Sequence, residues 1–169
     1  MHTFNNGIVL DPEINLSDIR DSFEAKMNIP WARAEAALRR APPNSMLSVY
    51  PDRHSRTIMV EIRRPDLVDG TLAFVQRQQG GNWTLNIGNI RAEEQGQGTV
   101  RRLFPHFIQM AKGFGVVDMS LRATSVGRYS WVKFGFIPCA ESWTDLSSKA
   151  KQLVKIDYRN RPDIVQDIS

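Results

Sequence analysis

The sequence predicts an α/β protein of the α+β type, in which a twisted, mostly antiparallel sheet is flanked by helices. Two helix-like segments come first, strand-like segments separated by turn residues follow, and a strongly amphipathic helix then leads into a further strand. The chain has 169 residues, of which 41% are hydrophobic and 24% are charged. This length and composition are typical of one globular domain, which we expect to span residues 1–169.

The first third of the chain predicts one short strand and two helices. Residues 7–10 are an apolar strand candidate. Residues 15–27 carry apolar side chains at fourfold spacing, with Asn15 or Ser17 placed to cap the helix. A second helix is expected over residues 30–40, because a proline suits a first helical turn and an alanine-rich segment follows it.

The middle of the chain predicts three or four strands. Turns rich in Pro, Asp and Ser, or in Gly and Asn, separate them and are typical of hairpins, so neighbouring strands are expected to be antiparallel. The candidate strands are residues 46–50, 57–63, 70–77 and 82–90.

The clearest periodic element is the helix that follows the turn at residues 95–98. Its apolar side chains recur at three- and four-residue steps and form one stripe, which predicts packing against a sheet. They are Val100, Leu103, Phe104, Phe107, Ile108 and Ala111. Pro105 is expected to bend this helix, and Gly113 and Gly115 to end it. Residues 117–123 then alternate between apolar and polar side chains, as in a strand.

The rest of the sequence predicts two more helices and indicates the cellular compartment of the protein. Further helices are expected over residues 125–134 and 144–154, and no stretch is apolar enough to cross a membrane. Cys139 is the single cysteine, so no internal disulfide can form and a reducing compartment is favoured. The N-terminus also lacks the pattern of a secretory signal. We therefore expect a cytoplasmic protein with no membrane partner.

The chain is mildly basic, with a net charge of +4. Three arginine pairs, which begin at Arg39, Arg63 and Arg101, are typical of a solvated surface or of attraction to an anion. Nucleic acid is left open as a substrate, although the pattern of aromatic and basic residues found in RNA-binding modules is absent. Metal-ligand spacing is absent too, so no metal is expected.

The sequence Gln95-Gly96-Gln97-Gly98 lies between a strand candidate and the amphipathic helix. Glycine lets a backbone approach a ligand closely, and the first helical turn offers unpaired N–H groups at the positive end of the helix dipole. Together these features predict an anion site, most naturally for a pyrophosphate. The segment is not a Walker loop, since no Gly-Lys-Ser/Thr follows, and Arg101 stands where the dinucleotide fingerprint has its third glycine.

The glycine turn resembles the Q/R-x-x-G-x-G/A motif of the GNAT superfamily of N-acetyltransferases, because Gln95-Gly96-Gln97-Gly98 matches its last four positions, with Gly96 and Gly98 as the two glycines. Further on, Ser-Trp-Val-Lys-Phe-Gly-Phe at residues 130–136 resembles the closing L-Y-x-K-x-G-F signature of that family. The resemblance is specific over residues 87–138 and architectural before them. It implies a sheet whose central strands splay apart and bind the pantetheine arm of acetyl-CoA, with the pyrophosphate at the turn.

The resemblance also implies which residues bind each part of the cofactor. Asn89 and Ile90 would face the pantetheine arm, and Thr124 and Arg128 the far side of the cofactor, while the thioester would lie near Trp131. The pyrophosphate would lie against the turn and the start of the helix, at Gln95, Gly96, Gln97, Gly98 and Thr99.

Departures from the family pattern bear on the chemistry. The opening Arg or Gln of the motif falls on Glu93, and the tyrosine that protonates the leaving thiolate falls on Trp131. An indole cannot give up its proton as a phenol does. Trp131 and Tyr129 are the candidates near the thiolate. Glu61 and Asp118 are the candidates for the general base, although a structural role in a strand is the plainer alternative for each.

Two functions follow from the resemblance. The first is an N-acyltransferase that transfers an acetyl group from acetyl-CoA, or another acyl-CoA, to an amine in a direct ternary complex. The alternative is a catalytically weak or inactive relative that binds acyl-CoA or a protein partner. The acceptor amine would belong to a small molecule or a protein, in a pocket that includes Trp31, Tyr50, Arg53 and His54. A homodimer is left open, since an exposed strand edge can pair with a second copy.

Overall fold

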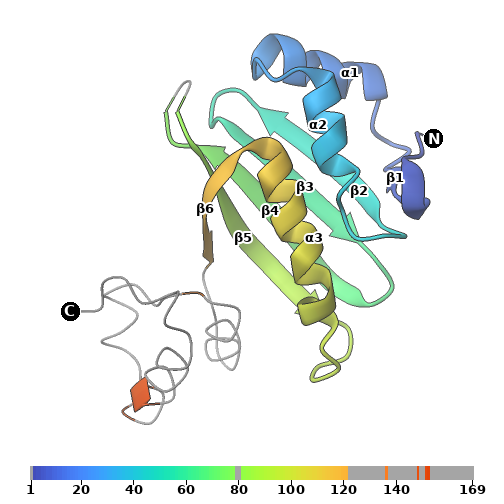
Figure 1. Cartoon of the computed structure of the whole chain (residues 1–169). Helices are drawn as coiled ribbons and strands as arrows, with labels where there is room; N and C mark the ends of the chain where they lie inside the picture. Colours follow the sequence, from blue (N-terminus) through green and yellow to red (C-terminus); the bar gives the residue numbers. More distant parts are fainter. Residues whose placement is uncertain (1, 79–80, 122–135, 137–147, 149–150, 153–169) are drawn as a thin grey trace. The chain divides into compact units, whose positions relative to one another are not determined.

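The computed structural model describes residues 2–78, 81–121, 136, 148 and 151–152. The chain divides into two compact units, residues 1–121 and 122–169, and nearly all described residues belong to the first (Figure 1). The helices predicted over residues 125–134 and 144–154 lie largely outside the described residues. The single domain over residues 1–169 stays a prediction.

Short elements form the N-terminal part of the first unit. In chain order they are η1 (Asn5–Gly7), β1 (Val9–Leu10), α1 (Leu16–Asp21), the π-helical turn η2 (Ser22–Lys26) and α2 (Trp31–Leu38). The predicted first helix is thus divided into α1 and η2. Asn15 caps it, because its side-chain oxygen accepts the Ser17 N–H at 2.9 Å. The first strand is shorter than predicted because Gly7 has a φ of 69° and leaves the extended conformation.

Longer strands and one long helix complete the unit. They are β2 (Met46–Asp52), β3 (Thr57–Arg63), β4 (Leu67–Gln76), β5 (Trp83–Ala92), α3 (Thr99–Phe114) and β6 (Val116–Leu121). The four strands predicted in the middle of the chain are confirmed, with small shifts at their ends. The prediction that Gly113 ends the long helix is wrong, because α3 continues past it. Gly115, with a φ of 75°, is the residue that ends α3.

The strands form one six-stranded sheet in the order β1-β2-β3-β4-β5-β6. Strands β2 to β5 are antiparallel neighbours, as the hairpin turns predict. By contrast, β1 pairs with β2 in parallel, and β5 pairs with β6 in parallel. Parallel neighbours need a crossover connection, which α3 supplies between β5 and β6. The predicted mixed, mostly antiparallel sheet flanked by helices is therefore confirmed.

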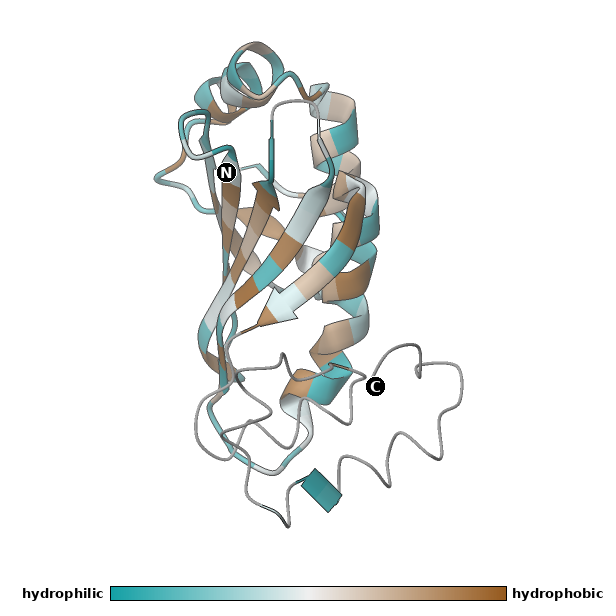
Figure 2. Ribbon diagram, turned by 90° about the vertical axis from the view of Figure 1, so that its left-hand side faces the viewer, coloured by the Kyte–Doolittle hydropathy of each residue, from teal (hydrophilic) through white to brown (hydrophobic). Residues whose placement is uncertain are grey.

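The helices of this unit lie on one face of the sheet, and apolar residues alternate with polar ones along the strands (Figure 1, Figure 2). The apolar rows point toward the helices and form the core. At its centre the Phe74 ring of β4 lies 4.6 Å from the Phe114 ring of α3. No described helix covers the opposite face, which we call the open face (Figure 2). Tyr50 and Met59 are exposed on it, since they alternate with buried residues of β2 and β3.

Helices α2 and α3 meet closely at the C-terminal end of α3. A Cβ atom added to Gly113 would lie 2.7 Å from Ala37 Cβ, so glycine at this position allows the two helices to touch. Arg33 of α2 donates from Nη2 to the Phe114 carbonyl at 3.0 Å, which pairs a carbonyl that the helix end leaves without an internal partner. The C-terminal end of α3 is thus fixed by α2.

Candidate functional site

The glycine turn between β5 and α3 is exposed throughout residues 93–98. Gly96 and Gly98 have φ angles of 82° and 69°, in the left-handed region that favours glycine. A Cβ atom at Gly96 would meet no other atom within 4 Å. The turn therefore needs glycine for its backbone conformation, and the space beside it is open to a ligand.

The first turn of α3 offers backbone donors next to that space. Gly98 precedes the helix and has no side chain to cap it, and the N–H groups of Thr99, Val100 and Arg101 find no acceptor within the described part of the chain. The first helical bond runs from the Arg102 N–H to the Gly98 carbonyl at 3.1 Å. Unpaired N–H groups at the positive end of a helix of 16 residues attract an anion.

The Arg102 side chain folds back onto the turn. Its Nη1 donates to the Gln97 carbonyl at 2.7 Å, and its Nη2 donates to Thr99 Oγ1 at 3.2 Å. These bonds stabilise the turn and place a positive charge beside Gly98. Sequence reasoning missed this residue. The available signal was its position one helical turn after Gly98, because side chains on a helix lean toward the N-terminus.

Strand β5 continues past the end of its pairing with β6. The pairing ends where Ile87 lies opposite Leu121, so residues 88–92 have no partner strand on this side among the residues that the structure describes. Asn89 and Ile90, which are predicted to face the pantetheine arm, lie in this stretch. The edge of an unpaired strand can bind an extended ligand through backbone N–H and C=O groups. The predicted splay would begin beyond Leu121, outside the described residues.

A β-bulge marks the start of this stretch. Thr71 pairs with Asn89, whereas the next residue of β4, Leu72, pairs with Ile87, which leaves Gly88 as an extra residue on β5. A bulge of this kind re-aims the strand locally and is frequent beside active sites. Here it lies next to the point where the described pairing of β5 with β6 ends.

Acidic side chains also lie near the turn. Glu93 and Glu94 are exposed in it, where their charge opposes an anion. The Asp66 carbonyl accepts the Glu93 N–H at 3.0 Å, and the Asp66 carboxylate accepts from Arg64 Nε at 2.8 Å. This hydrogen bond from Arg64, with the charges of Arg64 and Arg102, lowers the pKa of Asp66. An anion at the turn would thus depend on the backbone donors and Arg102 to offset the two glutamates.

Glu61 shares a row of the sheet with Asn89. Successive cross-strand partners run from Ser48 to Glu61, from Glu61 to Thr71 and from Thr71 to Asn89. The first three lie on the open face, because their neighbours along each strand point into the core, and Asn89 continues the row as the cross-strand partner of Thr71. Two strand spacings separate Glu61 from Asn89, about 10 Å between backbones. Of the two predicted carboxylates, Glu61 is the one on the row of the predicted cofactor contact.

Asp118 is placed differently. Its Oδ2 is ion-paired with Arg77 Nη2 at 2.7 Å, and Oδ1 is buried without a hydrogen-bond partner among the described residues. Asp118 pairs with Thr84, which lies five positions before Asn89 on β5, about 16 Å along the strand. A carboxylate that is paired and distant is poorly suited to accept a proton at the thioester, so we give Asp118 a structural role.

Thr124, Arg128, Tyr129 and Trp131 lie outside the described residues. Gln95, Gly96, Gln97, Gly98 and Thr99 are brought together in the turn and the first residue of α3, as the resemblance implies.

The predicted acceptor residues do not form one pocket. Trp31 lies in the core with its ring 5.9 Å from the Phe23 ring, so its expected place in an acceptor pocket is wrong. Arg53 and His54 lie in the β2–β3 turn, where the His54 N–H donates to Asp52 Oδ1 at 2.9 Å. Tyr50 is exposed on the open face.

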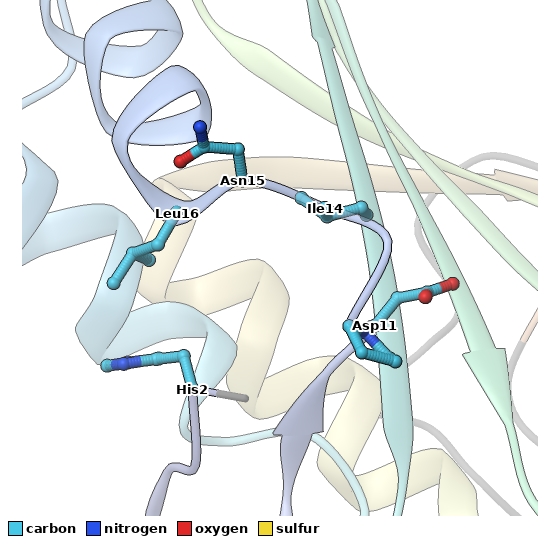
Figure 3. Close-up of a pocket in the computed structure, with 6 residues that line it drawn as sticks. His2, Asp11, Ile14, Asn15 and Leu16 are labelled. Atoms are coloured by element: carbon cyan, nitrogen blue, oxygen red, sulfur yellow. The ribbon is translucent and has the colours of Figure 1, made fainter.

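A separate hollow lies near β1 and the start of α1, with a volume of about 410 Å³ (Figure 3). His2, Asp11 and Asn15 are its polar residues. The Asp11 carboxylate points away from His2 in Figure 3 and already accepts from the Glu13 N–H at 3.0 Å and from Ser48 Oγ at 2.8 Å. Because these groups do not converge on a common point, the hollow offers no reacting site.

Asp11 instead stabilises the fold, and its contribution depends on pH. Hydrogen bonds from the Glu13 N–H and Ser48 Oγ, and the charge of Arg63 at 3.1 Å, lower its pKa against the opposing effect of burial. A lowered pKa contributes stability that is present above the ordinary aspartate value, about 3.9, and is lost as the pH falls below it.

We expect Asp11→Asn to lower the melting temperature by several degrees at pH 7, because the bound carboxylate is lost. The difference from the parent protein should shrink below about pH 4, where Asp11 begins to bind a proton in the unfolded chain. Thermal melts followed by circular dichroism over this pH range would measure it. Glu13→Gln is the matched control, since it removes a neighbouring exposed charge and keeps the backbone N–H. An equal loss at pH 7 and pH 3 would contradict the prediction.

In the part of the chain that the structure describes, no group of three or more His, Cys, Asp or Glu side chains is placed to hold a metal ion. None of the described helices is long and apolar enough to cross a membrane.

Comparison with protein-family models, with curated proteins and with solved structures gives no significant match to this chain.

Proposed function

We propose that the protein is an N-acyltransferase that binds acetyl-CoA, or another acyl-CoA, at the glycine turn and along the unpaired end of β5. The observation that carries this proposal is the juxtaposition of two features. An exposed turn with two left-handed glycines leads into a helix whose first N–H groups are unpaired among the described residues. Among the described residues, the end of the strand just before that turn has a neighbour on one side only. A pyrophosphate suits the first feature, and an extended pantetheine arm suits the second.

The proposed reaction is direct transfer in a ternary complex. The neutral amine attacks the thioester carbonyl, so that a C–N bond forms as the C–S bond breaks. The proton that the amine gives up passes to Glu61 through a water molecule, and the coenzyme A thiolate leaves and takes a proton from solvent or a nearby hydroxyl. The Ile90 N–H would donate to the tetrahedral oxyanion. Holding both reactants side by side supplies the main rate enhancement.

Titration calorimetry with acetyl-CoA, and with desulfo-coenzyme A as an unreactive analogue, tests the cofactor site. We expect saturable one-to-one binding that Gly98→Glu weakens about 100-fold, equal to about 2.7 kcal/mol. The reason is that a side chain and a negative charge would then occupy a left-handed position beside the anion. Gln109→Glu is the matched control, because it adds the same charge to an exposed position of α3. Absence of binding at millimolar ligand would overturn the proposal.

Tryptophan stands at position 131, where the family motif has tyrosine. This favours one alternative, a protein that binds acyl-CoA but transfers the acyl group slowly or not at all. A Trp131→Tyr variant separates the two, because a phenol can protonate the leaving thiolate. Turnover that rises in this variant indicates a slow enzyme. Cofactor binding without turnover in either form indicates a binding protein.

A further inference from the structure

The open face of the sheet carries an apolar patch beside Glu61. Tyr50 and Met59 are direct cross-strand partners and are 46% and 39% exposed. Met59 and Glu61 are two positions apart on β3, so their side chains point to the same side. An exposed aromatic and an exposed thioether next to a carboxylate form a surface that is apolar at one end and acidic at the other.

The acidic end is not neutralised by the arginine beside it. Arg63 Nη1 lies 3.1 Å from Asp11 Oδ2, whereas its Nη2 lies 3.9 Å from Glu61 Oε2. Two carboxylates thus share one guanidinium, and the nearer of them is the buried Asp11. The local balance is negative at Glu61, whose side chain is partly exposed, so a cation is the complementary ligand.

The patch also lies close to the stretch of β5 where the thioester is proposed to bind. Glu61 is on the cross-strand row that leads through Thr71 to Asn89 on β5. An ammonium group at Glu61 therefore lies between the apolar patch and the stretch of β5 where the acyl group is expected. Met59 is partnered by Ala73 on β4, a small residue that leaves room for a flat ligand body across the strands.

From this geometry we infer that the acceptor is a small amine with a flat apolar body, of the arylalkylamine class. Its body lies on Tyr50 and Met59, and its ammonium group lies at Glu61. This inference rests on the proposed function for the transfer step, but binding of the amine can be measured without it. Aromatic and apolar contacts supply most of the affinity, and Glu61 selects for the charge.

The test uses 2-phenylethylamine as probe, with 2-phenylethanol as its uncharged analogue, and the full chain without cofactor. Saturation-transfer NMR titrations should show that the amine binds about threefold more tightly than the alcohol. Tyr50→Ser and Met59→Ser should each weaken binding of both probes about tenfold. Glu61→Gln should remove the difference between amine and alcohol while leaving alcohol binding unchanged. A merely structural role of Glu61 would not produce this selective change.

Val68→Ser and Val117→Ser are the matched controls, since these residues are 45% and 63% exposed outside the patch. They should leave both affinities unchanged. Binding of 2-phenylethylamine without binding of acetyl-CoA would keep the amine site and overturn the transferase. Conversely, acetylation of spermidine that is indifferent to Tyr50→Ser and Met59→Ser would keep the transferase and overturn the inference. Equal effects of control and patch variants would also overturn it.

Discussion

Replacing Phe114 with alanine is expected to lower the free energy of unfolding by about 3–5 kcal/mol, the range measured for buried phenylalanines. Phe114 is 1% exposed and joins three elements of the core. Its ring lies 4.6 Å from Phe74 on β4 and 6.3 Å from Phe23 in η2. Truncation would remove these contacts and leave a cavity that neighbours on a sheet and two helices cannot fill by moving independently.

Urea unfolding followed by circular dichroism measures this loss. Because domains are stable by only about 5–15 kcal/mol, Phe114→Leu is needed beside the alanine variant, and we expect it to cost less while still folding. Val117→Ala is the control for an exposed apolar residue. A loss below about 1 kcal/mol for Phe114→Ala would mean that this aromatic cluster does not hold α3 to the sheet.

Much of the fold is predictable because its signals are local. Apart from Met59, the segment from Thr57 to Arg63 alternates apolar and polar residues, and it is a strand with those bounds. The apolar stripe of α3 likewise places Leu103, Phe107 and Ala111 in the core, as expected. Hairpin turns predict antiparallel neighbours because only short connections are needed.

The errors arise where distant parts of the chain meet. Gly113 was expected to end a helix, since glycine often does so, yet it lies inside α3, where Ala37 of α2 occupies the space that a side chain would take. Trp31 was expected near an acceptor, yet it packs against Phe23. Neither contact leaves a signal in the local sequence, because each partner lies on another element.

The candidate site was predictable in part for the same reason. The glycine turn and its helix are contiguous in sequence, so Gly96 and Gly98 could be assigned to one turn from their spacing, and the structure shows that both have a left-handed backbone. The row that joins Glu61 to Asn89 depends on strand register and on the bulge at Gly88, which the sequence does not specify. Register also separates Glu61 from Asp118, two carboxylates that the sequence alone could not rank.

In the structure, one arginine of each arginine pair is bound by another group of the protein. Arg39 is paired with Glu35 at 2.7 Å and Arg64 with Asp66 at 2.8 Å, while Arg102 is bonded to the Gln97 carbonyl at 2.7 Å. Each is bonded within the protein, and a basic surface for nucleic acid would need its cations turned outward to phosphates. These bonds engage one arginine of each pair within the fold, and nucleic acid stays an open prediction.

Gly113→Ala is the second large effect that we expect, and its sign distinguishes packing from helix propensity. In an isolated helix the change would stabilise by about 1 kcal/mol. Here the new Cβ would lie 2.7 Å from Ala37 Cβ and 2.8 Å from Ala37 Cα. Since the second atom belongs to the backbone, α2 has to shift away from α3, and we expect a net loss of about 1–3 kcal/mol.

A double-mutant cycle with Ala37→Gly identifies the cause. Removing the Ala37 side chain relieves only the contact with its Cβ, so the double variant should recover part of the stability lost in Gly113→Ala. Lys112→Ala, at an exposed neighbouring position of the same helix, should stay within about 0.5 kcal/mol of the parent. If Gly113→Ala instead raised the unfolding midpoint in urea, the close contact between α2 and α3 would be absent in solution. In that case α2 would not hold the C-terminal end of α3, the end opposite the glycine turn.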